Sequence, residues 1–373
     1  MLVSILIFIL VLSILVLVHE LGHFIIARRA GVKVEEFGFG IPPRLIGKKI
    51  GETIYSINAL PFGGFVRLHG EQDEEGITDP KRAFLNKSKK ARALVIIAGV
   101  IMNFLLAIVA FAIVYSFTGV PRDTGKLKVI DVTSGSPAQV AGIIVGDVIT
   151  KVGNDPITSS DDFIAKTAAL KGKRTTFEIQ RNFGGRDTAT KITLTPRENP
   201  PAGEGPIGVT ITTMEIYYPP VWQRPFYGIY YGFKDALFWG KTIVLGLGGI
   251  IGGLFKGQVP QDVSGPVGIF AVTTEAAKSG ILTLINFIGI LSVNLAILNI
   301  LPFPALDGGR LLFIGIESVA RRKVSPRVEG TIHNIGMIIL LTLLLLITIG
   351  DIRRLITFGG IQGFINSIGN GVK

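Results

Sequence analysis

A cluster of ionisable residues follows an apolar run near the start of this 373-residue chain. The letters HELGH place His19, Glu20 and His23 directly after residues 1–18, which carry no charge. Ionisable side chains are costly inside a bilayer and usually mark function there. On a helix, residues four apart share one face, so both imidazoles can bind one ion, as in the H-E-x-x-H pattern.

The chemistry predicted for this pattern is metal-assisted hydrolysis. Neutral imidazoles suit zinc, which lowers the pKa of a bound water toward 7. A carboxylate beside that water can take its proton and pass it to a leaving amine, so Glu20 is the expected general base and acid. The alternative is a helix end at which His and Glu simply meet the membrane interface.

A catalytic zinc needs a third protein ligand, and the chain has no cysteine to supply it. His69 lies in a polar loop and His333 at the edge of an apolar run, so we expect both to be ordinary interfacial residues. Asp307, in NLAILNILPFPALDGGR, follows a later apolar run and is the better candidate. An aspartate in a Pro/Gly turn is the simpler alternative.

Four long uncharged runs indicate a membrane protein: residues 1–18, 93–118, 281–306 and 335–350. A helix needs roughly 20 apolar residues to span a bilayer. Only 17% of the residues are charged, whereas a soluble protein has about 25%. The first run lacks the features of a cleaved signal peptide, so we expect a retained helix and about four spans.

The net charge of +11 is concentrated beside the predicted spans rather than spread as in a nucleic-acid-binding protein. Residues 24–92 carry 13 Lys and Arg, and five more follow the third run. By the positive-inside rule both loops face the cytoplasm. The N-terminus, residues 119–280 and the C-terminus then face outward.

This topology places Asp307 at the depth of the histidines only if residues 242–255 do not cross the membrane. That glycine-rich stretch, in an aromatic region over 219–262, is short for a span and is predicted to be interfacial or re-entrant. If it crossed, Asp307 would emerge about 30 Å away on the opposite side.

The remaining chain divides into recognisable parts. Alternation over 53–58 and 65–68 predicts short membrane-associated strands. SPAQVAGIIVGDVI resembles the hallmark of PDZ domains in bacterial proteases. The expected domains are a first catalytic membrane half (1–118), one α/β PDZ domain (124–198), an interfacial linker (199–280) and a second catalytic membrane half with a C-terminal tail (281–373).

Taken together, HELGH, the Gly38–Gly40 loop, the PDZ-like stretch and N-x-x-P-x-P-x-L-D-G-G around Asp307 resemble the site-2 protease family of intramembrane zinc metalloproteases, in its bacterial RseP/RasP group. Two departures are a single PDZ unit and AGVIMNF in the second run, where the family usually has proline after the glycine. Asn103 of that stretch is expected to hydrogen-bond between helices. The resemblance implies Zn²⁺ held by His19, His23 and Asp307, with Glu20 as base, and substrate contacts from Asn294, Asn299, Gly38 and Gly40.

The resemblance also implies a bacterial inner-membrane enzyme that cuts single-span proteins, such as anti-sigma factors or signal-peptide remnants, near the cytoplasmic side. Its PDZ domain would lie outside the cytoplasm and take a peptide or protein ligand; no nucleic acid is expected. A membrane helix must unwind before its peptide bonds are accessible, and an edge strand can bind the unwound backbone. The alternatives are a water-facing membrane-anchored zincin, a non-catalytic PDZ adaptor and, less favoured, a transporter.

Overall fold

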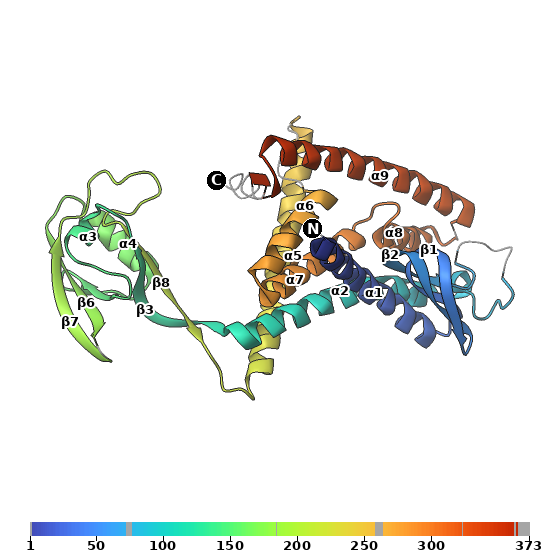
Figure 1. The fold of residues 1–373 in the computed structure, drawn as a ribbon, viewed down its shortest axis with the longest axis horizontal. Coiled ribbons are helices and arrows are strands. Elements are labelled where there is room, and N and C mark those ends of the chain that lie inside the picture. Colours follow the sequence, from blue (N-terminus) through green and yellow to red (C-terminus); the bar gives the residue numbers. More distant parts are fainter. Residues whose placement is uncertain are drawn as a thin grey trace. The chain divides into compact units, whose positions relative to one another are not determined.

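The computed structural model describes residues 2–71, 77–183, 185–257, 264–322, 324–361 and 363–364, so residues 365–373 of the predicted tail lie outside it. Contacts divide the chain into two compact units (Figure 1). The helical unit comprises Met1–Phe117 and Gln223–Lys373, and the soluble unit comprises Thr118–Trp222.

Long apolar helices dominate the helical unit. Five of them are long and apolar enough to cross a membrane, by length and composition: α1 (Leu2–Arg29), α2 (Lys89–Thr118), α5 (Arg224–Phe255), α7 (Ile281–Ile300) and α9 (Pro326–Thr357). Shorter helices are η1 (Phe84–Asn86), α6 (Pro266–Ser279) and α8 (Asp307–Ala320). The chain is therefore a multi-pass membrane protein, as predicted, but the predicted count of four spans is not confirmed.

Helix α5 accounts for the difference in count. The stretch 242–255, predicted as a short interfacial segment, forms the C-terminal part of this longer helix. The uncharged run stops at Lys241, but the helix accommodates charge before it: Tyr115 of α2 donates to the Asp235 carboxylate at 2.8 Å. Ala236 is buried together with Phe111 of α2 and Val293 of α7. Further along α5, a Cβ added at any of four glycines would have no described atom of another element within 4 Å: Gly246, Gly248, Gly249 and Gly252.

Helices α1 and α2 pack closely through a glycine. A Cβ added at Gly22 would lie 2.3 Å from the Ala98 carbonyl oxygen, so only glycine permits this approach. Next along α2 is Gly99, which brings the backbone of α2 against the HELGH side chains. Nearer the N-terminus of α1, Val11 and Leu15 are buried with Leu291 of α7. The histidine-bearing helix is thus fixed by neighbours from both halves of the chain.

Between α1 and α2 the chain forms β1 (Val34–Ile50) and β2 (Thr53–Leu68), which are antiparallel. Both strands bend, so residues 36–39 are paired on two edges: with 64–67 on one side and with 54–57 on the other. Residues 46–50 then pair with 53–57. The stretch 64–68 is consequently an outer edge of this sheet. The Ser13 hydroxyl of α1 donates to the Pro61 carbonyl at 3.1 Å and ties the sheet to that helix.

The soluble unit is a mixed α/β module. It contains β3 (Val120–Val132), α3 (Pro137–Val140), β4 (Val148–Val152), β5 (Asp155–Pro156), α4 (Ser160–Ala169), β6 (Thr175–Phe183), β7 (Arg186–Leu194) and β8 (Val209–Tyr217). The strand order is β7-β6-β4-β3-β8, with β5 beside β4. Because β8 pairs with β3, the unit extends past residue 198, where the predicted domain ended. Gly184, between β6 and β7, lies outside the described residues.

Two polar side chains stabilise the soluble unit locally. The Ser159 side chain caps α4 by accepting from the backbone N–H of Asp162. Asp147, from the GD pair of the PDZ-like stretch, is fully buried and forms a two-pronged ion pair with Arg181. Its other contact is the backbone N–H of Ile144 at 2.9 Å, so this aspartate stabilises the fold.

Candidate active site

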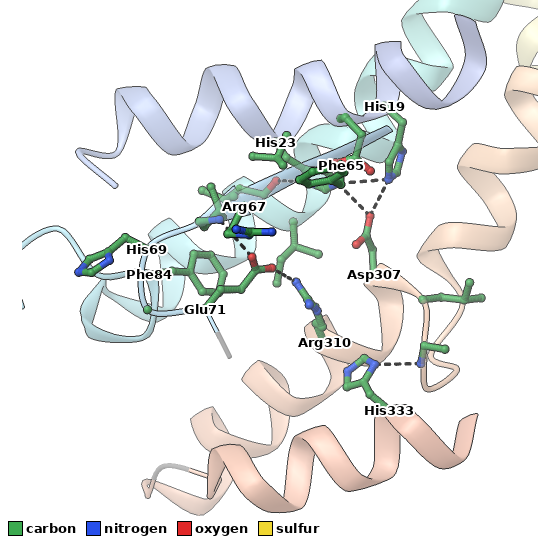
Figure 2. A pocket seen from close by; sticks show the side chains of 18 of the residues that line it. His19, His23, Phe65, Arg67, His69, Glu71, Phe84, Asp307, Arg310 and His333 are labelled. Atoms are coloured by element: carbon green, nitrogen blue, oxygen red, sulfur yellow. Dashed lines mark hydrogen bonds and ion pairs between the residues drawn. The ribbon is translucent and has the colours of Figure 1, made fainter. Parts of the chain in front are cut away.

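Three side chains from the two ends of the chain converge in the helical unit (Figure 2). The Asp307 Oδ2 atom lies 3.0 Å from His19 Nε2 and 3.3 Å from His23 Nε2, and the two Nε2 atoms are 3.1 Å apart. Tetrahedral zinc with bonds of about 2.0–2.1 Å spaces its ligands by about 3.3 Å. Within the described part of the chain, this is the one group of three such side chains that could hold an ion.

The surroundings of His23 leave its Nε2 atom free for a metal. The Nδ1 atom lies 2.8 Å from the Val95 carbonyl oxygen of α2. A carbonyl only accepts, so Nδ1 carries the proton and donates, and the lone pair is on Nε2. A second group that fixes the tautomer in this way is typical of metal-binding histidines.

His19 meets the amide of Asn103, which is completely buried in α2. The Asn103 Nδ2 atom lies 3.4 Å from His19 Nδ1, and its Oδ1 atom has no hydrogen-bond partner among the described residues. If the Asn103 amide is turned by 180°, its Oδ1 atom accepts from the His19 Nδ1–H. The amide oxygen and the imidazole N–H then both have a partner. Asn103 does link helices, since Ser292 of α7 donates to its backbone carbonyl at 2.7 Å. Its side chain additionally meets one imidazole of the cluster.

Gly99 is a further part of this site that sequence patterns did not indicate. A Cβ at this position would lie 2.5 Å from His23 Nε2 and 2.6 Å from His19 Cε1. Both imidazoles therefore rest directly against the α2 backbone. Gly99 is the glycine of AGVIMNF, but that stretch gave it no role in the site, and only the helix packing reveals one.

Asp307 is the first residue of α8, where the chain turns sharply after α7. A Cβ at the next residue, Gly308, would lie 2.0 Å from the Leu301 carbonyl oxygen, so the turn requires glycine. Burial raises the pKa of the Asp307 carboxyl, but hydrogen bonds and charge from His19 and His23 lower it more, and the pKa lies below its usual range. The carboxylate is thus held ionised, as a zinc ligand must be.

The other two histidines have different partners. His69 Nδ1 lies 2.8 Å from a Glu35 carboxylate oxygen, and His69 Nε2 accepts from the Asp79 backbone at 3.1 Å. His333 Nδ1 accepts from the backbone N–H of Ala305 at 2.9 Å. Neither joins the cluster of three ligands.

Glu20 lines a cavity of about 710 Å³ together with the three ligands. The outer sheet edge also forms its wall, through Phe65, Val66, Arg67 and Leu68. A Cβ at Gly64 would lie 3.7 Å from Glu20 Cγ, so this edge runs beside the carboxylate.

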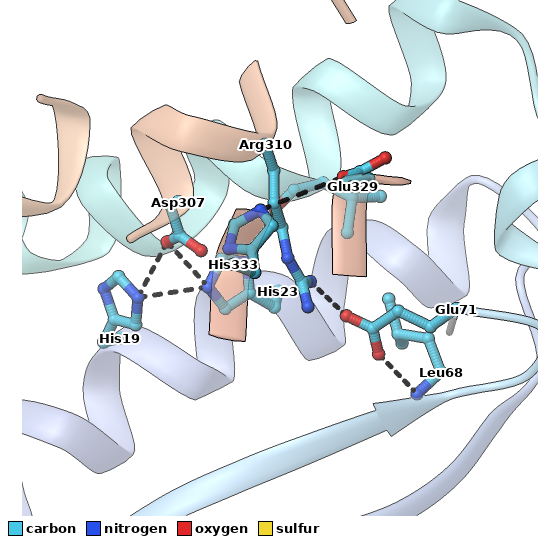
Figure 3. Close-up of polar contacts among 9 residues, drawn as sticks. His19, His23, Leu68, Glu71, Asp307, Arg310, Glu329 and His333 are labelled. Carbon is cyan, nitrogen blue, oxygen red and sulfur yellow. Dashed lines mark hydrogen bonds and ion pairs between the residues drawn. The ribbon is translucent and has the colours of Figure 1, made fainter. Parts of the chain in front are cut away.

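Arg310 and Glu71 form an ion pair on the wall of the cavity, and Glu71 also accepts from the Leu68 backbone at 3.3 Å (Figure 3). The pair joins α8 to the end of β2. A second cavity, of about 970 Å³, shares these two residues and His333 with the first.

The four residues expected to contact substrate do not line the cavity. Gly38 is paired on both edges, with Phe65 and Ser56, and its missing Cβ makes room for the Phe65 ring, 2.4 Å away. Gly40 has φ +81° and marks the bend of β1, where its carbonyl accepts from Asn58 at 3.2 Å. Asn294 and Asn299 are half-buried on α7.

Comparison with known proteins agrees with this geometry. The model of peptidase family M50 matches residues 7–343. A provisionally named zinc metalloprotease of Clostridium perfringens is 38% identical over 91% of this chain and 96% of its own. Zinc metalloprotease RasP of Geobacillus kaustophilus is 32% identical over 94% of this chain and 98% of its own.

One solved structure, the PDZ domain of the SdrC-like protein from Listeria monocytogenes, is 26% identical and covers 25% of this chain and 94% of its own, with a TM-score of 0.20. The family match extends over both membrane halves and includes HELGH and Asp307. The chain belongs to peptidase family M50, the site-2 protease family of zinc metalloproteases.

Proposed function

We propose that this metalloprotease hydrolyses peptide bonds of single-span membrane proteins at a zinc ion held by His19, His23 and Asp307. The observation that carries the proposal is the convergence of three ligand atoms, 3.0 to 3.3 Å apart, at the ends of apolar helices. The donor set fits zinc: two imidazoles, one carboxylate and an adjoining cavity that leaves room for a water and a substrate carbonyl.

Glu20 is the proton carrier in this proposal. Zinc, when bound, polarises the scissile carbonyl and acidifies water. Glu20 lines the same cavity, so its carboxylate can take the proton from the attacking water. The same carboxyl then delivers the proton to the leaving amine nitrogen, so that the C–N bond breaks with neutral products.

The outer edge of the sheet is the proposed substrate platform. A transmembrane helix hides its peptide groups in internal hydrogen bonds, and unwound backbone needs new partners in an apolar setting. Residues 64–68 are paired on one side only within the described sheet and form the cavity wall, so an extended segment can add there as a further strand. This places backbone recognition at Phe65–Leu68 rather than at Gly38 and Gly40, which support that edge from within. Asn294 and Asn299 stay predicted contacts.

The proposed orientation follows from charge and from the ligand geometry. Arg28 and Arg29 end α1, and the loop to α2 is rich in Lys and Arg, so this side is assigned to the cytoplasm of a bacterial inner membrane. Asp307 must reach the depth of His19. If α5 crosses the bilayer, the chain between it and α7 must therefore return to the same side.

The soluble unit, predicted to be a PDZ domain, would then lie outside the cytoplasm. There it would bind a peptide or protein ligand and limit access by substrates. The chain has no cysteine, so single-cysteine variants in this unit and in the loop at Arg321 can test the topology by labelling.

The deciding experiment uses the full chain in lipid vesicles with a model single-span substrate. Glu20→Gln and Asp307→Asn should each abolish cleavage, while Glu275→Gln and Asp155→Asn, matched changes away from the cavity, should leave it intact. Cleavage by both Glu20→Gln and Asp307→Asn at the wild-type rate would exclude the proposed site. Cleavage of soluble casein but not of the single-span substrate would instead favour a water-facing protease.

A further inference from the structure

A strained turn precedes the third ligand. Ala305, two residues before Asp307, has φ +78°, in the left-handed region that a side chain with a Cβ disfavours. Among the described residues, one other that is not glycine has a positive φ, and it ends α8. A residue held in such a conformation persists only when its surroundings enforce it.

The enforcing contact comes from α9, a helix with no part in the chemistry. The Ala305 N–H donates to His333 Nδ1 at 2.9 Å (Figure 2). Three residues further along the same face, Gly336 lies so close that an added Cβ would be 2.4 Å from the Pro304 side chain. Most of α9 is exposed or half-buried, so these two contacts form a defined junction between α9 and the turn.

We propose that His333 is a positioning residue: it holds the Ala305 turn in its left-handed form and thereby keeps the Asp307 carboxylate at the zinc site. The inference rests on the proposed role of Asp307 as a ligand. The acceptor is Nδ1, so the imidazole is neutral with its proton on Nε2. His333 acts through the turn and does not touch the ligand atoms.

Zinc affinity is the readout, measured on the purified full chain in detergent by competition with a chelator. His333→Leu removes the acceptor, so the turn relaxes and zinc should bind about tenfold more weakly, equivalent to about 1.4 kcal/mol. His333→Asn places Oδ1 near the position of Nδ1 and should stay within about threefold of the wild type. Thr342→Val, a polar-to-apolar change elsewhere on α9 at a residue that lines neither cavity, should have little effect.

A second-site change tests the strain directly. Glycine adopts positive φ without penalty, so Ala305→Gly should restore most of the affinity lost in His333→Leu while changing little in the wild type. If the double variant is no better than His333→Leu, or if His333→Asn fails as badly as His333→Leu, the positioning role is wrong.

The two proposals fail differently. If Asp307→Asn binds zinc as tightly as the wild type, the ligand assignment falls and the role of His333 falls with it. If Asp307→Asn loses zinc but His333→Leu keeps it, the ligand assignment stands and only the positioning role is overturned. Thermal unfolding of each variant by circular dichroism shows whether a loss reflects a misfolded chain, in which case the Ala305→Gly rescue decides.

Discussion

Replacing Gly99 by alanine should empty the metal site without unfolding the protein. The added Cβ would lie 2.5 Å from His23 Nε2 and 2.6 Å from His19 Cε1. Non-bonded contacts need about 3.5 Å, so the rings must retreat by about 1 Å. Metal–ligand distances tolerate only about ±0.2 Å, so the two imidazoles cannot both keep their bonds. Moving the helices apart would sacrifice the contact of Gly22 with Ala98.

We expect zinc affinity to fall about 100-fold, or about 2.7 kcal/mol, with a comparable loss of proteolysis. Alanine favours helix over glycine by up to about 1 kcal/mol, so α2 itself should not be weakened. The assay is zinc retained after dialysis against a chelator, with thermal unfolding in detergent as a check. Gly246→Ala, on an open face of α5, is the control. A Gly99→Ala protein that is folded and retains zinc like this control would refute the packing argument.

Three further outcomes follow from the site. Asn103→Leu should weaken zinc binding 10- to 100-fold, because Nδ1 of His19 loses its partner; equal affinity would show that the amide has no such role. Glu20→Gln should bind zinc normally while cleavage falls at least about 100-fold, and loss of zinc in this variant would contradict a purely proton-carrying role. On acidification, protons should displace zinc from the site before Asp307 is protonated, because the pKa of the Asp307 carboxyl lies below its usual range. The measurement is dialysis at stepped pH. Release of zinc only below pH 4 would assign the loss to protonation of the Asp307 carboxyl instead.

The candidate ligands could be predicted from the sequence because four-residue spacing places His19 and His23 on one helix face, and the resemblance points to Asp307. The structure brings these three side chains together. The crossing argument did not contribute, because residues 242–255 belong to a helix long and apolar enough to span a membrane. In contrast, Gly99 and Asn103 touch the histidines through the rotation of α2 about its axis. That rotation depends on packing between helices distant in sequence, which no local pattern encodes.

The length of α5 and the pairing of the β1–β2 sheet were not predicted, and each has a specific cause. Lys234, Asp235 and Lys241 interrupt the apolar run before residue 242, so the sequence predicts only the short stretch 242–255. Lys234 in fact lies 4.9 Å over the Tyr230 ring, and Asp235 accepts from a tyrosine, so these charges do not end the helix. Strands were predicted over 53–58 and 65–68, whereas Gly38 and Gly40 were assigned to a loop; the structure places both glycines in β1. The pairing of residues 36–39 on both edges depends on bends that alternation does not reveal.

The separation of the ligands along the chain also has a consequence for biosynthesis. His19 and His23 emerge from the ribosome early, whereas Asp307 follows only after the soluble unit and three further helices, α5, α6 and α7. At roughly 5–20 residues per second, this interval is on the order of tens of seconds. Throughout that time the nascent chain has two imidazoles but no complete zinc site. With the ligand set proposed above, this zinc metalloprotease therefore becomes active only once its synthesis is nearly finished, and a prematurely terminated chain lacks a complete site.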